Sequence, residues 1–467
     1  MALSFVNGTS ISLEAIPTCS FAAFREAFLE PAFERDRKRV LAYWRLPDGR
    51  VACVFGNPAT HRLEVLAVDG TEVRPLTPEV PALHRFEAEL EGRENACPFV
   101  PLKGAAAHEV AVGPVHAGVI EPGHFRFQCM GETVHSLEIA LGYQHRGVER
   151  LMVETTSDIR RLALAETVAG DTSIAAALAC SLVLNPGRES FFTFSPFDFS
   201  TLFLELERIA NHVGDLGALA GDVAYLPTAS FCGRIRGEYL NMTAELCGNR
   251  FGRGALTGCL VTDNRTAKLE KIRPWFARTK RELFHALDLL FTETSALERF
   301  EGTGTVPAAV ARAIGLTGLA GRASGLAVDS RIDFPLPGEP VRESLVAAEL
   351  RTGDVLSRAR QRYSELLVSH HLVETILSNG MVGSVVSNDQ RPTTNDYTLT
   401  VAVVEAWRGE LVHLAVVGAE GKVEQYKIFD PSYHNWFGLA QALRNEQISN
   451  FPICNKSFNL SYCGVDR

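Results

Sequence analysis

Five polar residues between positions 121 and 171 of this chain could move protons. They are Glu121, His145, Arg146, Glu166 and Asp171. Glu121 stands in the segment IEPGHF, where apolar neighbours would raise the pKa of its carboxyl group and let it exchange protons near neutral pH. The alternative is that Glu121 caps the following turn by accepting hydrogen bonds from backbone amides. Both interpretations carry equal weight at this point.

His145 and Arg146 belong to the segment GYQHRGVER, at an expected junction between a strand and a helix. Glu149 fits the first turn of that helix, because negative charge is favoured at a helix N-terminus. That explanation leaves His145 and Arg146 without a structural reason, so we interpret these two as functional. Asp171 has a simpler alternative, as a local cap for a helix that begins at Thr172.

Several segments together resemble a known protein family. Residues 113–150 read GPVHAGVIEPGHFRFQCMGETVHSLEIALGYQHRGVER, and residues 165–178 read AETVAGDTSIAAAL. Both resemble the large subunit of membrane-bound, energy-converting nickel–iron hydrogenases of the formate hydrogenlyase type, and its relative, the quinone-site subunit of respiratory complex I. Further matches are LELERIANHVGDLG at 204–217, GRASGLAVDSRIDFP at 321–335 and EAWRGELVHLAVV at 405–417. In related hydrogenases, a Glu at the place of Glu121 hands protons away from the metal.

The resemblance also implies four metal ligands, which this chain lacks. Hydrogenases of the family hold nickel and iron with two short-spaced cysteine pairs, because soft thiolates select such metals. The corresponding positions here are Ala169 and Thr172, in a register fixed by Gly170, and Ser461 and Gly464 in the tail SFNLSYCGVDR. These degenerate ligand positions predict that the chain has no Ni–Fe centre.

The remaining cysteines do not replace the lost pairs. Cys463 is one residue out of register, Cys454 lies upstream of both places, and Cys180 is isolated. Without a short-spaced pair, each is expected to be a buried structural residue. We therefore expect no cofactor bound by this chain, and we expect Glu166 and Asp171 to flank an emptied pocket.

A quinone site is a further alternative that the complex I resemblance raises. Complex I holds the quinone headgroup between a His in the first hairpin and a Tyr on the following helix. His116 and His124 could supply the first partner, but the Tyr position is Gly170 here. Two-electron, two-proton quinone chemistry needs a proton donor near each carbonyl oxygen, so this alternative is the less favoured one.

The elements that position these residues form two units. Residues 1–102 alternate short strands with helices, an α/β pattern with hairpin-type turns at Asp48-Gly49 and Asp69-Gly70. The end of this unit, LTPEVPALHRFEAELEG, resembles the small accessory subunit of complex I, which is fused to the large subunit in several energy-converting hydrogenases. Residues 103–107 are expected to form a linker, and residues 108–467 the hydrogenase-like unit.

The predicted fold class is α+β: a small α/β unit, then a mainly helical bundle with a β-hairpin and a C-terminal β-meander. In the first unit, we expect a helix at 21–33 and strands at 40–46, 51–55 and 62–68. In the second, we expect hairpin strands at 124–130 and 133–143, helices at 173–184, 200–220, 278–297 and 354–379, and meander strands at 398–407, 411–418 and 425–429.

The matched blocks also contain buried-looking charges. Arg322 and Arg331 are expected either to form buried ion pairs, which is the favoured interpretation, or to line the redox cavity. Arg208, with its neighbours Asn211 and His212, is expected to tie helices together. Residues 408–410 are expected to form a turn into a strand, with Gly409 supplying backbone freedom.

Composition excludes several classes of function. The net charge of -9 argues against nucleic acid or anionic lipid as the main partner. No apolar run reaches the roughly 18–20 residues that cross a bilayer, and no signal peptide is expected. The ten cysteines contain no CxxC pair, which indicates the reducing cytosol. Phosphate-binding loops and nucleophilic-serine elbows are absent, and GNRFGRG is a poor dinucleotide fingerprint.

The resemblance implies a cytoplasmic-side subunit of a membrane-bound, complex I-like oxidoreductase. Its partners would be an iron–sulfur subunit, which carries the cluster, and antiporter-like membrane subunits. The chain would pass electrons from that cluster to an unidentified acceptor with coupled proton or ion movement. The alternatives are a non-catalytic structural subunit of the same complex and, less favoured, a quinone reductase or a hydrogenase with an unorthodox site.

Overall fold

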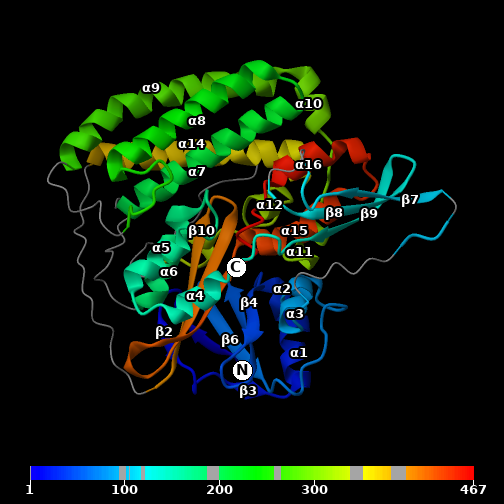
Figure 1. The fold of residues 1–467 in the computed structure, drawn as a ribbon, viewed down its shortest axis with the longest axis vertical. Helices are drawn as coiled ribbons and strands as arrows, with labels where there is room; N and C mark the ends of the chain where they lie inside the picture. Colours follow the sequence, from blue (N-terminus) through cyan, green and yellow to red (C-terminus); the bar gives the residue numbers. More distant parts are fainter. Residues whose placement is uncertain are drawn as a thin grey trace.

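The computed structural model describes residues 2–93, 101–104, 106–116, 121–186, 199–256, 265–336, 351–379 and 396–467. Figure 1 shows a small N-terminal unit at one end of the molecule and a bundle of long helices at the other. A β-rich middle, with the C-terminus inside it, separates the two. The predicted α+β architecture, with a β-hairpin and a C-terminal β-meander, is confirmed.

The N-terminal unit is built on one sheet with the strand order β1-β6-β5-β4, and β3 is parallel to β6. Its strands are β1 (Leu3–Phe5), β3 (Thr18–Cys19), β4 (Arg39–Arg45), β5 (Val51–Asn57) and β6 (Arg62–Val68), and its helices are α1 (Phe21–Leu29), α2 (Pro31–Arg35) and α3 (His84–Leu90), with a 3-10 turn at Pro81–Leu83. Phe24 and Phe28 share one face of α1 and are buried in the core. The single helix expected at 21–33 is divided, because Pro31 begins a new helix.

The first residues of the chain tie this unit to the other one. Strand β2 (Ser10–Ser12) pairs with β10 (Thr398–Ala406), far along the chain. The side chain of Asn7 is fully buried, donates to the carbonyls of Phe334 and Val403, and accepts the Val403 amide. The expected linker at 103–107 includes residue 105, which lies outside the described residues, and β7 already begins at Ala107.

A three-stranded antiparallel sheet projects beside the bundle, with the order β7-β8-β9. Its strands are β7 (Ala107–Val112), β8 (His124–Met130) and β9 (Thr133–Ala140). Gly131, at φ +60, makes the tight turn of the predicted hairpin. The second hairpin strand ends at Ala140, three residues before the expected Tyr143, and β7 was not predicted.

Four long helices form the bundle: α7 (Phe199–Asp222), α8 (Leu226–Cys247), α9 (Arg265–Thr292) and α14 (Val355–Asn379). Helix α7 packs against α8 and α14, and α8 packs against α9. The helices expected at 200–220 and 354–379 are confirmed. The helix expected at 278–297 starts earlier, ends at Thr292 and is followed by α10 (Thr294–Phe300), while α8 was not predicted. No helix in the described part of the chain is long and apolar enough to cross a membrane.

The C-terminal meander supports the site. Its sheet has the order β12-β11-β10-β2, with β11 at Gly409–Val417 and β12 at Val423–Phe429. Helix α6 (Ser173–Leu184) packs on β10 and β11, and it is the fully buried core helix that its apolar sequence predicts. The other elements are α4 (Val148–Glu154), α5 (Asp158–Ala165), α11 (Ala308–Ala313), α12 (Gly318–Ala323), α13 (Ser330–Asp333), α15 (Pro431–Ala442) and α16 (Phe451–Phe458), with 3-10 turns at Ala419–Gly421 and Ile448–Asn450.

Candidate functional site

The loop between α5 and α6 is held by an arginine from the turn between β10 and β11. Arg408 donates to both carboxylate oxygens of Asp171, at 2.7 and 2.8 Å. Its guanidinium also lies over the Trp407 ring, 3.9 Å from the centroid. The indole N–H of Trp407 donates to the Asp171 carbonyl at 3.0 Å. The turn between two strands therefore fixes both the backbone and the side chain of Asp171.

The backbone around Arg408 requires small residues. Gly409 has a φ of +139, and a Cβ on either Gly409 or Gly318 would approach the other glycine within 2.6 Å. The close approach of these two backbones sets the direction in which Arg408 leaves the sheet. The expected role of Gly409 in this turn is confirmed.

A second loop, near the C-terminus, packs against the first loop. The backbone of Gly170 lies against the thiol of Cys463. The Cys463 amide donates to the carboxylate of Glu121 at 3.4 Å. Ser461 accepts the Gly464 amide at 2.9 Å, and its hydroxyl lies 3.6 Å from the Cys463 sulfur. The two loops that would carry the paired ligands in a hydrogenase therefore face each other.

The charges at this junction have different pKa directions. Burial raises the pKa of Glu121; Arg408 opposes that shift and Asp171 adds to it. Burial would also raise the pKa of Asp171, but the paired Arg408 holds it below its ordinary value. Burial raises the pKa of the Cys463 thiol. The site thus pairs an ionised Asp171 with a nearby carboxyl that retains its proton to higher pH.

Glu121, Asp171 and Arg408 line one cavity of about 1170 Å³. The side chain of Asp171 keeps 32% exposure. The cavity runs along α7 and α8 to α16, and His116 and Tyr462 also line it. A carboxyl with a raised pKa beside an ion pair, open to a cavity of this size, can exchange protons with a bound molecule.

The residues at the four expected ligand positions do not fit a nickel–iron group. Ala169 presents a methyl group and Gly464 no side chain, and a Cβ on Gly464 would meet Asp430 and Ser461 oxygens at 2.8 Å. Thr172 and Ser461 offer hydroxyls, which are not the soft thiolates that such metals select. Among the described residues, no group of three or more His, Cys, Asp or Glu side chains could hold a metal ion.

The other predicted residues lie elsewhere. His145, one of the five residues that could move protons, lines a separate cavity with Glu149 and does not line the cavity of Glu121 and Asp171. The reason is that the segment after β9 packs against the C-terminal residues, because Asp466 accepts the amides of Gly142 and Gln144. Arg146 is exposed and donates to the carbonyl of Val168, which supports the α5–α6 loop from outside the cavity.

Glu166, His124 and the expected cap complete the placements. Glu166 accepts the Gly254 amide at 2.8 Å, and burial raises its pKa. His124 begins β8 and does not line the cavity, whereas His116 does. The cap role suggested for Asp171 is wrong, because it is Glu207 that accepts the first free amides of α6.

Arg408 is the residue that the sequence interpretation missed. It was expected only as part of a turn, yet it is the counter-ion of Asp171. Burial works against its charge, but the Asp171 carboxylate raises the pKa of Arg408 above its ordinary value. Its place in a matched block, between a buried Trp and a Gly, was the signal available.

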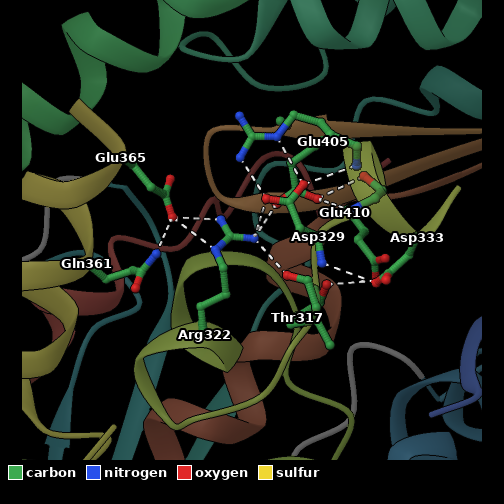
Figure 2. Close-up of polar contacts among 12 residues, drawn as sticks. Thr317, Arg322, Asp329, Asp333, Gln361, Glu365, Glu405 and Glu410 are labelled. Atoms are coloured by element: carbon green, nitrogen blue, oxygen red, sulfur yellow. Dashed lines mark hydrogen bonds and ion pairs between the residues drawn. The ribbon is translucent and has the colours of Figure 1, made fainter. Parts of the chain in front are cut away.

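Behind the site lies a buried network of ion pairs, which Figure 2 shows. Arg322 lies between Glu365 and Glu405, with a shortest contact of 2.8 Å to each. Arg331 pairs with Asp329 at 2.7 Å. The buried ion pairs predicted for Arg322 and Arg331 are confirmed.

The network connects three parts of the fold. Arg39 of the N-terminal unit contacts Glu410 of β11 and lies 2.7 Å from Asp333. His212 of α7 contacts Glu365 of α14 at 2.9 Å. Arg208 of α7 donates to backbone carbonyls of β10. His212 thus ties α7 to α14 as expected, and Arg208, which lies 4.0 Å from the same Glu365, also bonds α7 to β10.

Known proteins share this sequence pattern. Residues 222–398 match the family model described as respiratory-chain NADH dehydrogenase, 49 Kd subunit. The chain is 27% identical over 360 residues to formate hydrogenlyase subunit 5 of Escherichia coli, covering 77% of this chain and 63% of that protein. It is 26% identical to membrane-bound hydrogenase subunit alpha of Pyrococcus furiosus, covering 77% and 87%. It is 28% identical to the carbon monoxide-induced hydrogenase of Rhodospirillum rubrum, covering 76% and 98%.

A solved structure shares the fold. A chain of the membrane-bound sulfane sulfur reductase, an archaeal respiratory membrane complex, superposes with a TM-score of 0.66 at 21% identity. The match covers 78% of this chain and 99% of that one.

Proposed function

We propose that this chain is the acceptor-site subunit of a membrane-bound oxidoreductase. It belongs to the family that unites the large subunits of membrane-bound hydrogenases with the 49 kDa-type subunit of complex I. It receives electrons from an iron–sulfur partner subunit on the cytoplasmic side. It passes them to an acceptor in the cavity beside Glu121 and Asp171, with coupled proton or ion movement and without a Ni–Fe centre.

The observation that carries this proposal is the Glu121–Asp171–Arg408 cluster at the cavity. A subunit with a purely structural role has no need of a half-buried carboxyl with a raised pKa that opens to such a space, because burying polar groups costs stability. Glu121 would hold and release the proton that accompanies each electron. Arg408 would orient Asp171 and keep it ionised beside the acceptor.

The alternative function is a structural subunit that transmits conformational change within the same complex. The buried network around Arg322 favours it, because that network connects the N-terminal unit, the meander and the bundle in one set of contacts. The two functions differ in one respect: only the first requires chemistry at Glu121.

The test is to purify the chain from membranes with the subunits that accompany it. We expect an iron–sulfur subunit and membrane subunits, iron but no stoichiometric nickel, and no hydrogen from reduced viologen. The reduced clusters should be reoxidised by one class of acceptor among quinones, sulfur compounds and carbon compounds. One nickel per chain with hydrogen uptake would refute the proposal. Clusters reoxidised equally fast with and without the Glu121 carboxyl would favour the structural role.

A further inference from the structure

A second cavity, of about 240 Å³, lies apart from the site described above. It lies where α3 of the N-terminal unit meets β9 and α15 of the hydrogenase-like unit. Its walls are mainly apolar and aromatic and include Phe86, Ile139, Tyr433, Trp436 and Phe437. Concave sites of this kind bind small molecules when a few polar groups face into them.

Arg85 on α3 is the cation of this cavity. Its Nε is buried and has no hydrogen-bond partner. Within the described ranges, the side chain forms no ion pair either, and its guanidinium lies 5.4 Å from the centre of the Tyr433 ring. Burial lowers the pKa of Arg85. A half-buried guanidinium whose Nε has no partner is stabilised when a carboxylate binds it.

The acid one turn from Arg85 on the same helix already has partners. Glu89, one turn along α3, contacts both Lys427 and Arg467. It also accepts a hydrogen bond from the Tyr433 hydroxyl at 2.8 Å. Glu89 is therefore committed to two other cations. Asp466, which attracts Arg85 more strongly, accepts the backbone amides of Gly142 and Gln144 and forms no ion pair with Arg85 in the described structure, so Arg85 is left for an external anion.

The other titratable groups of the cavity do not add positive charge. Burial lowers the pKa of His434 to about 4 and also lowers the pKa of His84, so both rings are neutral at pH 7. Glu138 of β9 is the acid that lines the cavity. An anionic group can therefore be oriented in only one way, with its charge toward Arg85 and away from Glu138.

The walls favour a flat ligand. His84 stacks on Phe437 with ring centres 5.1 Å apart and an angle of 23° between the planes. Phe86 packs against Tyr433 with ring centres 5.0 Å apart. The cavity is smaller than the roughly 300–1,000 Å³ of sites for drug-sized ligands, which suits a molecule with a single ring.

We propose that this cavity is a binding site for a small aromatic carboxylate, with the carboxylate on Arg85 and the ring between the aromatic walls. The site bridges the two units of the chain, so an occupant would stabilise their contact. It is independent of the proposed function, since no residue at the Glu121 cavity takes part in it.

Isothermal titration calorimetry of the full chain with benzoate tests the site without any substitution in the protein. Benzamide has nearly the same shape but no charge, and cyclohexanecarboxylate has the charge but no flat ring. We expect saturable benzoate binding and a raised melting temperature, with benzamide at least about tenfold weaker. Equal affinity for benzoate and benzamide, or no benzoate binding at millimolar concentration, would overturn the proposal.

A substitution then assigns the anion contact. Arg85→Gln should weaken benzoate about tenfold or more, and Arg85→Lys should retain part of the affinity because it keeps the charge but loses the planar fork. Arg93→Gln is the matched control, because Arg93 is an exposed residue just after α3 that pairs with Glu91. Benzoate affinity that is the same in Arg85→Gln as in the unmodified chain would also refute the site.

Discussion

Arg408 and Asp171 form a two-pronged ion pair between the turn of the meander and the loop before α6, although 237 positions separate them in the chain. The pair fixes the loop of Ala169 and Thr172, which is one of the two loops that would carry the paired ligands in a hydrogenase. Among the described residues, it is the only ion pair that both lines the large cavity and acts on the Glu121 carboxyl.

Asp171→Asn should destabilise the chain at neutral pH. The folded-state pKa of Asp171 is lowered, so its contribution is present above the unfolded-state pKa near 4 and is lost as pH falls below it. Removing one partner of a buried pair costs about 3–5 kcal/mol, and the partial exposure of Asp171 reduces this to about 2 kcal/mol. Urea unfolding at pH 7 and pH 3.5 checks this, with Asp288→Asn, at an exposed position of α9, as control. An undiminished difference at pH 3.5 would argue against the ion pair as its cause.

Glu121→Gln should have opposite effects on activity and stability. Its folded-state pKa is raised, so the protonated form stabilises the fold at low pH, and that contribution is lost as pH rises through the folded pKa. The Gln variant cannot ionise, so it should be more stable than the unmodified chain at pH 8 and equal to it near pH 4. Turnover of the assembled complex should fall about 100-fold, the lower range for a proton-transfer group.

The control for Glu121 is Glu109→Gln, on β7 beside the strand β8 that follows Glu121, where Glu109 is paired with Arg126. It should leave turnover unchanged. Unchanged turnover in Glu121→Gln itself would remove Glu121 from the mechanism and bring the structural role forward.

Two glycines in the facing loops should respond differently to the same methyl group. A Cβ on Gly464 would lie 2.8 Å from oxygens of Asp430 and Ser461, whereas a Cβ on Gly170 meets nothing within 4 Å. Gly464→Ala should therefore cost about 1–3 kcal/mol through overpacking. Gly170→Ala should be neutral or stabilising by about 0.5 kcal/mol. Denaturant unfolding of the two variants decides this, and equal costs would contradict the packing described for the second loop.

The sequence alone predicted the helices whose pattern of apolar residues is strong. The apolar run at 173–184 and the stripe along 200–220 predicted α6 and α7, because periodicity reports burial directly. Helix α8 was missed because glycines and arginines interrupt its pattern. Helix α9 was misplaced because Pro274 lies inside the helix, and a proline in the sequence normally indicates a helix boundary.

The site was only partly predictable for a related reason. Glu121 and Asp171 were identified because they belong to matched segments, and both line the cavity. The position of His145 depends on where the chain goes after β9, and Asp466, over 300 residues later, directs that path. The role of Arg408 depends on a contact across the fold, which no local pattern encodes.

The buried network predicts a large loss of stability from a single truncation. Arg322 contacts Glu365, Glu405 and Asp329, all of them buried. Arg322→Ala leaves three acids without that cation, and breaking a buried pair costs about 3–5 kcal/mol. Arg278→Ala is the control, because Arg278 is exposed and its ion pair with Glu282 is long, at 3.9 Å. This variant should change stability by less than about 0.5 kcal/mol. A cost below about 1 kcal/mol for Arg322→Ala would show that the network is not a source of stability.

The N-terminal segment should hold the two units together after the chain is cut between them. Trypsin is expected to cleave at Lys103, which is exposed. The fragments should nevertheless elute together, because β2 pairs with β10 and Asn7 makes three buried hydrogen bonds across the units. Asn7→Ala leaves those backbone groups unpaired, which costs about 1–3 kcal/mol of stability. The fragments of the cut variant should therefore separate at a lower urea concentration than those of the cut, unsubstituted chain. Thr9→Ala is the control, because the Thr9 hydroxyl donates to nearby Val6 and, in the described part of the chain, makes no hydrogen bond across the units. If the cut, unsubstituted chain separates in native buffer, β2 does not join the units in solution.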